Sequence, residues 1–240
     1  MAKVIIIYDG IGTCCSEDLR LADGMSSSRS STQYLSSHEI PGQLLHNIVV
    51  EKDASEKLVV VVMPGVSVDL RFNVELIGEG AEANIYGAYI CAGQEKVKIA
   101  VDMHHEVPHC NSRQLFKGIA GGSSKVDFYG KIIVAKDAQR TEAYQENHNL
   151  LLSDGAKVDT KPQLEIYADD VKCSHGATIG RLNEEEQFYM RSRGITLEDA
   201  KVLQMISFVA PVLENIEDDV EREKITAALE SAIRNIVHNQ

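Results

Sequence analysis

Cys173 and His175 are the two side chains whose types and spacing most suggest chemistry. They stand two residues apart in the stretch 169–178, and in an extended strand they would share one face, about 6–7 Å apart at ~3.3 Å per residue. A thiol and an imidazole so placed could ligate iron, or the imidazole could lower the pKa of the thiol. Alternatively, Cys173 is a small core residue and His175 a hydrogen-bonded turn residue. Residue chemistry alone favours this structural interpretation.

The densest group of potential metal ligands lies upstream of this pair. His104, His105, His109 and Cys110 combine imidazole and thiolate, which suit iron, zinc or copper(I). His104 and His105 are adjacent, so in a strand they point to opposite faces and cannot both ligate one ion. We therefore favour a structural role around the turn at Pro108 over a preformed metal site, and the metal preference of the group stays open.

Residues 78–83 match the glycine-rich dinucleotide loop G-x-G-x-x-A. Such a loop needs a helix immediately after it, whose N-terminal amides face the pyrophosphate. The following residues, 84–87, have strand character instead, so we predict a plain turn. The sequence contains no P-loop motif and no CxxC, which argues against P-loop ATP hydrolysis and against finger-type zinc.

Composition narrows the classes of partner and compartment. The 240 residues include 24 Lys and Arg and 36 Asp and Glu, for a formal net charge of −12. Nucleic acids and anionic membranes favour basic patches, so both are unlikely partners. No apolar run approaches the ~20 residues of a membrane helix, and no secretory signal is recognisable. Five irregularly spaced cysteines do not suggest a disulfide framework, so we expect a cytoplasmic protein.

Three regions along the chain differ in composition and in the pattern of apolar and polar residues. We expect an irregular segment over residues 1–45, with a flexible serine-rich loop at 25–37, because so polar a stretch cannot offset its ordering entropy. Residues 46–180 consist of short β-rich runs separated by turn residues, several of them alternating apolar and polar side chains. No helical period interrupts them, which leaves a sandwich, a barrel or a β-solenoid. The runs are 46–50, 58–62, 68–72, 83–89, 97–101, 114–119, 126–134, 149–152, 163–167 and 171–178.

Residues 181–240 form an acidic helical region. Acidic clusters at 184–186 and 217–219 are typical of first helical turns, and Pro211 should kink or end the helix that contains it. The last helix carries an apolar stripe that includes Ile225, Leu229 and Ile233. This stripe could contact a partner or could pack onto the other helices of the same region.

The blocks 149–153, 159–178 and 187–195 closely resemble the SufB/SufD family of the SUF iron–sulfur cluster assembly system. The B-type branch has E-H-E-A-T where this chain has Ser-His-Gly-Ala-Thr at 174–178, so the chain is similar to the D-type branch. It also lacks the long N-terminal helical region of the family. The resemblance implies a mainly β protein with a right-handed parallel β-helix (β-solenoid) core and a C-terminal α-helical region, and so favours the solenoid among the three alternatives.

The same resemblance implies a function and partners. It points to a non-catalytic scaffold in the SufBCD complex, paired through the β-helix with a SufB-type partner and docked to a SufC-type ABC ATPase. His175 matches a histidine implicated in cluster assembly at that interface, with Cys173 as second candidate and a transient iron or iron–sulfur cluster as cargo rather than a tightly bound cofactor. Ile225, Leu229 and Ile233 become candidates for the ATPase contact.

Two rival functions remain. A structural homodimer without cluster chemistry is compatible with the short N-terminus. A β-solenoid enzyme acting on acidic polysaccharides is disfavoured, because such enzymes use aromatic or basic grooves and this chain is acidic, has no Trp and contains only 5% aromatic residues.

Overall fold

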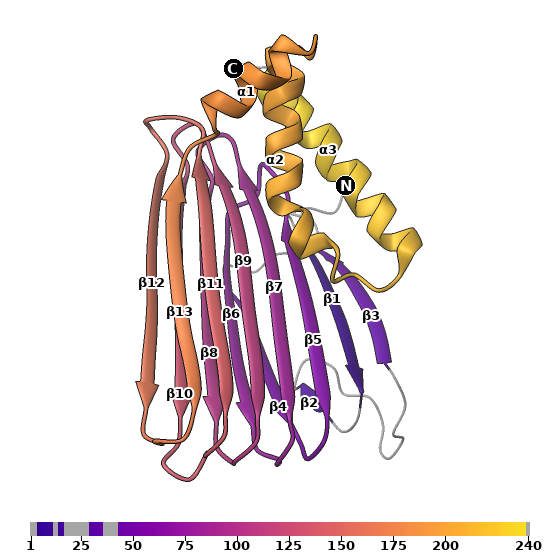
Figure 1. Ribbon diagram of the computed structural model, residues 1–240. Helices are drawn as coiled ribbons and strands as arrows, with labels where there is room; N and C mark the ends of the chain where they lie inside the picture. The colour runs from indigo at the N-terminus through magenta and orange to yellow at the C-terminus, as the bar shows by residue number, and fades with distance from the viewer. Residues whose placement is uncertain (1–3, 12–13, 17–28, 36–42, 239–240) are drawn as a thin grey trace.

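Two facing β-sheets and three helices make up the computed structural model of the chain, which describes residues 4–11, 14–16, 29–35 and 43–238 (Figure 1). The seven-stranded sheet, here called sheet A, has the order β13-β11-β9-β7-β5-β1-β3, and the six-stranded sheet B has the order β12-β10-β8-β6-β4-β2. The strands of sheet A are β13 (Lys172–Gly180), β11 (Glu142–Leu151), β9 (Asn111–Ala120), β7 (Glu82–Cys91), β5 (Ser55–Val62), β1 (Val4–Ile11) and β3 (Arg29–Leu35). Those of sheet B are β12 (Lys157–Ile166), β10 (Lys125–Val134), β8 (Lys96–His105), β6 (Val68–Leu76), β4 (Leu44–Val50) and β2 (Cys14–Ser16).

The connectivity identifies the architecture as a β-solenoid. From β4 onward the chain alternates between the two sheets, and each strand pairs in parallel with the strand two further along. A sandwich or barrel of antiparallel hairpins would pair consecutive strands instead. The prediction of a mainly β solenoid with C-terminal helices is confirmed, while the division into domains near residues 45 and 180 stays a prediction.

Period-two alternation explains why these segments become strands. In β8, Val97, Ile99 and Val101 are buried between the sheets, while Lys96 and Lys98 are exposed. Stacked coils repeat this pattern in register, so inward side chains form one continuous apolar core along the solenoid. Burial of this core is the dominant favourable term for such a fold.

Glycines inside two strands make room for large aromatic side chains. A Cβ on Gly118 of β9 would stand 2.0 Å from the Tyr89 ring, and one on Gly87 of β7 would stand 2.2 Å from the Phe116 ring. Both aromatic side chains are fully buried. These glycines therefore set which coil carries a bulky interior side chain and which leaves space for it.

The expectation of an irregular N-terminal segment is wrong for three of its stretches, which form β1, β2 and β3. β2 pairs antiparallel with β4 in sheet B. β1 pairs antiparallel with β5 and with β3, so β1 and β3 extend sheet A. Ile5, Ile6 and Ile7 of β1 are buried. β3 has a polar composition, but its backbone forms hydrogen bonds by pairing with β1. The serine-rich stretch thus contains an edge strand over residues 29–35, and the rest of the predicted loop lies outside the described residues.

Helices α1 (Glu184–Ser192), α2 (Leu197–Leu213) and α3 (Asp219–His238) follow the last strand. α2 packs over β7 and β9 of sheet A, and Figure 1 shows α3 beside α2, on the side of β1 and β3. α2 continues two residues past Pro211 and ends at Leu213. In the described part of the chain, no helix combines the length and hydropathy that crossing a bilayer requires.

The apolar stripe of α3 is buried within the molecule. Ile225, Leu229 and Ile233 are each at most 2% exposed and belong to one cluster with residues of α2 and sheet A. Packing onto the chain's own elements therefore accounts for the stripe. The sequence analysis named these three side chains as candidates for contact with an ATPase partner. In this structure they are buried and not available for that contact.

The turn between β7 and β8 holds a buried carboxylate. Glu95 accepts hydrogen bonds from the backbone N–H groups of Gly93 (2.6 Å), Gly65 (2.9 Å) and Ala92 (3.3 Å). Burial raises the pKa of Glu95, but these hydrogen bonds outweigh burial and hold the pKa below its usual value. The ionised carboxylate therefore ties two neighbouring turns of the solenoid together.

Replacing Glu95 by Gln should lower the free energy of unfolding by about 2 kcal/mol at pH 7, because hydrogen bonds to a charged acceptor are worth ~1.5–3 kcal/mol. A group with a depressed folded-state pKa stabilises the fold above its unfolded pKa and loses that contribution as the pH falls. The difference between wild type and variant should therefore shrink below about pH 4.3. Urea unfolding across this pH range measures it, with Glu51→Gln at an exposed position as control. A difference that does not depend on pH would contradict this account.

Candidate functional site

β12 and β13 are the last strands of the two sheets and form one end of the solenoid, on the side away from α3 (Figure 1). Their residues are exposed or half-buried, whereas the inward residues of the preceding coils are buried. We call this surface, residues 157–180, the open end. An uncovered strand edge presents unpaired backbone groups that another chain can pair with.

The hydrogen-bond register shows which backbone groups of β13 are unpaired. Lys172 N–H donates to the carbonyl of Thr141, which precedes β11. In a parallel ladder alternate residues bond to the same neighbour, so the even-numbered residues of β13 face β11. The N–H and C=O groups of Cys173, His175 and Ala177 therefore point away from the sheet, toward the open edge.

The edge of sheet B differs from that of sheet A. Lys157 N–H donates to the Ser124 carbonyl beside β10, so by the same alternation Pro162 faces the open edge of β12. Proline has no N–H and interrupts a ladder at that position. Strand pairing at the open end is therefore hindered on β12 and unhindered on β13.

Cys173 and His175 lie on the same face of β13, as the sequence predicted. Cys173 pairs with Ala143 and packs against the interior core, and burial raises the pKa of its thiol. The thiol is thus protonated in the isolated chain, which contradicts the idea that a neighbouring imidazole lowers its pKa. His175 is exposed at the open end, and its ring makes no hydrogen bond to any residue that the structure describes.

The His104–Cys110 group does not converge on one point. His104 faces outward with Nδ1 3.8 Å from Glu106, whereas His105 is fully buried, with Nε2 2.9 Å from the Ser112 hydroxyl. Burial lowers the pKa of His105 to about 4, and the buried Cys110 thiol donates to the Gly78 carbonyl. Among the described residues, no three His, Cys, Asp or Glu side chains gather to hold a metal ion.

In the glycine-rich stretch 78–83, residues 78–81 form the turn between β6 and β7, and the last two residues begin β7. Gly80 has φ +79°, and β7 begins at Glu82 with no helix following. The predicted turn is confirmed, and the dinucleotide loop is excluded at this position.

Sequence reasoning missed a row of polar side chains inside the solenoid, beneath the open end. On β11 the inward positions are Gln145, Asn147 and Asn149, all nearly or fully buried. Gln145 Nε2 donates to Gln114 Oε1 of β9 at 2.7 Å, and Asn147 Nδ2 donates to the Tyr89 hydroxyl at 3.2 Å. The signal in the sequence is the spacing of 31 residues between Gln114 and Gln145, which has meaning only once the length of a coil is known.

A family model described as SUF system FeS cluster assembly, SufBD core domain, matches residues 34–208. The chain belongs to the SufBD family. The match covers all the solenoid strands from β4 to β13, both Cys173 and His175, and the chain as far as α2.

Within the SufBD family, the chain is SufD-like. The chain is 41% identical over 162 residues to the iron-sulfur cluster assembly protein SufD of Escherichia coli K12, covering 67% of this chain and 38% of that protein. It is 32% identical over 193 residues to a SufBD family protein of Mycobacterium leprae, covering 77% and 49%. A SufBD family protein of Synechocystis is 47% identical over 109 residues, covering 45% and 24%. The chain thus spans less than half the length of these relatives.

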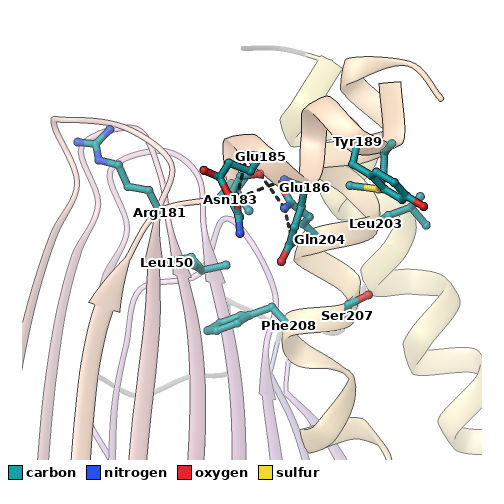
Figure 2. A pocket seen from close by; sticks show the side chains of 12 residues that line it. Leu150, Arg181, Asn183, Glu185, Glu186, Tyr189, Leu203, Gln204, Ser207 and Phe208 are labelled. Carbon is teal, nitrogen blue, oxygen red and sulfur yellow. Dashed lines mark hydrogen bonds between the residues drawn. The ribbon is translucent and has the colours of Figure 1, made fainter. Parts of the chain in front are cut away.

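A second feature of this SufBD chain is a groove of about 740 Å³ between the solenoid and its first two helices. Figure 2 shows Leu150 and Phe208 approaching it from β11 and α2, with Tyr189 of α1 at its far side. Asn183 caps α1 by accepting from the Glu185 and Glu186 N–H groups. Beside the groove, Phe188 is 73% exposed and Tyr189 59% exposed, so α1 presents aromatic surface to solvent.

Proposed function

We propose that this chain is a non-catalytic scaffold component of iron–sulfur cluster assembly, which pairs through the open end with a SufB-type partner. The observation that supports the proposal most strongly is the unhindered β13 edge, which carries His175. Family membership supplies the process, and the edge supplies a surface on which two subunits can share strands.

His175 is the proposed site residue at the seam, by which we mean the interface between the β13 edge and the partner subunit. Its side chain is exposed and makes no hydrogen bond within the described chain, so it is available to act on a group brought by the partner. A neutral imidazole offers one lone pair, which can ligate iron or accept a proton beside a partner's thiol. Iron and the cluster are cargo in this proposal.

Cys173 has a supporting role in the proposal. It lies two residues from His175 on the same face, and its thiol is half-buried and protonated. Ligation of iron would displace that proton, because a thiolate is the form that binds metal. We therefore rank Cys173 as a conditional ligand that acts only when metal is present.

The proposed contact with a SufC-type ABC ATPase involves α1 and α2. Exposed aromatic and aliphatic side chains are the usual anchors of a protein interface. Phe188, Tyr189 and Leu203 are exposed next to the groove, whereas the stripe of α3 is buried. An ATPase seated on α1 and α2 would stand next to the end of β13, which leads into α1, and next to Leu150 near the end of β11, which lines the groove (Figure 1).

Anaerobic reconstitution with ferrous iron and sulfide tests the proposal. We expect this chain alone to retain no cluster after desalting, and mixtures with the SufB-type scaffold and the ATPase to retain more cluster than those two proteins without it. Equal retention with and without this chain would overturn the proposal. Self-association of the chain without any effect on cluster yield would favour the structural homodimer instead.

A further inference from the structure

We propose that Gln145 positions the His175 imidazole by accepting a hydrogen bond from one ring nitrogen, which leaves the other nitrogen free to act at the open end. The importance of this role rests on the proposed function of His175, but the contact itself can be tested without that function. Gln145 lies on β11, and the parallel register makes Gln145 and His175 direct Cα partners. Side chains at paired positions of a parallel ladder stack on the same face.

The orientation of the Gln145 amide is set from the side away from β13. Its Nε2 donates to Gln114 Oε1 on β9 at 2.7 Å. In a ladder of stacked amides the N–H points to one neighbour and the carbonyl to the other. Because Nε2 is engaged on the side of β9, Oε1 is left for a donor on the side of β13, where the next rung is His175.

That carbonyl oxygen lacks a hydrogen bond where one is needed. Gln145 is 1% exposed, and its Oε1 is buried with no hydrogen-bond partner among the described residues. Buried polar atoms in native proteins are nearly always paired. The ring of His175, which also lacks a partner among these residues, is the donor that the register supplies.

The opposite sheet holds the Gln145 side chain in place. Gly130 of β10 lies against the amide, and a Cβ at this position would stand 2.1 Å from Nε2 and 2.6 Å from Cδ. The amide is thus confined between Gly130 and Gln114 and cannot swing away from the ladder. A fixed acceptor of this kind is what orients an imidazole elsewhere in proteins.

The consequence is selection of one imidazole tautomer. A neutral imidazole carries a proton on one nitrogen and a lone pair on the other, and the hydrogen bond at one nitrogen decides which is which. With the proton held toward Gln145, the lone pair lies on the nitrogen facing the seam. Gln145 is therefore a positioning residue, and His175 is the residue that would touch the cargo.

Nitrogen-15 spectra of the ring nitrogens, recorded on the 240-residue chain at a pH where the ring is neutral, test this directly. His175→Ala identifies the His175 signals. In the wild type we expect one tautomer of His175 to exceed the other by about tenfold. Gln145→Met keeps the length of the side chain but removes the carbonyl. In this variant the tautomer ratio should equal that of the urea-unfolded chain. Gln145→Glu, which keeps an acceptor, should restore the preference.

Asn147→Ala is the matched control, because it removes a buried amide from the same strand that is paired with Ala177 instead of His175. It should leave the tautomer ratio unchanged. An unchanged ratio in Gln145→Met, or an equal change in Asn147→Ala, would overturn the assignment of Gln145. These spectra need no cluster, so their failure is distinct from failure of the proposed function, which would appear as normal cluster delivery by His175→Ala.

Discussion

Replacing His175 by Ala should reduce cluster delivery at least tenfold while leaving the fold intact. The side chain is exposed, so its loss costs the fold at most the single hydrogen bond to Gln145 that we propose above. Surface substitutions of this kind usually change the free energy of unfolding by less than about 0.5 kcal/mol. The measurement is complementation in cells that depend on this chain, together with thermal unfolding of the purified variant.

His104→Ala is the control for this experiment. His104 is also an imidazole on the surface of the solenoid, but it faces outward from sheet B near Glu106, away from the β13 edge. It should support delivery at the wild-type level. Unimpaired delivery by His175→Ala would remove His175 from the site, whereas equal loss in both variants would point to a general effect on the solenoid.

The sequence predicts those parts of the fold in which alternation is complete. In β8 and β10 most inward residues are apolar and most outward ones polar, so period two locates both strands. The predicted run 126–134 matches β10 closely, whereas the run 97–101 stops short of the end of β8, where the buried His105 breaks the pattern. In β11 both faces are polar, because Gln145 and Asn147 point inward. The pattern therefore indicated only residues 149–152 of a strand that spans Glu142–Leu151. Alternation also could not choose a solenoid over a sandwich, since the choice depends on which strands pair.

The site was predictable only in part, for the same reason. That Cys173 and His175 share a face follows from strand geometry alone. That β13 ends its sheet, that its edge is unhindered, and that Gln145 lies directly beside His175 all depend on pairing between residues about one coil apart. Likewise, the stripe of Ile225, Leu229 and Ile233 predicted an apolar helix face correctly but could not say whether the chain or a partner covers it.

Replacing Ala177 by Pro should abolish association through the β13 edge without unfolding the chain. The Ala177 N–H faces the open edge and bonds to nothing in sheet A, and its side chain is exposed. Proline is tolerated on an edge strand when its missing N–H faces solvent, and Pro162 already occupies such a position on β12. A partner strand, however, would lose a ladder hydrogen bond and meet the proline ring.

We expect the dissociation constant for the edge-paired complex to rise about a hundredfold. At 1.4 kcal/mol per tenfold, this factor corresponds to a loss of ~2–3 kcal/mol in the free energy of binding. The lost ladder hydrogen bond accounts for ~0.5–1.5 kcal/mol of it, and the steric conflict with the proline ring accounts for the rest. Sedimentation velocity of the chain, alone and with the SufB-type scaffold, measures the effect. Ala177→Val, which keeps the N–H and favours a strand, is the control. If Ala177→Pro associates as tightly as Ala177→Val, the interface between the two subunits does not use β13. His175 would then lie outside that interface, and the chemistry proposed for it with a partner's group would have no basis.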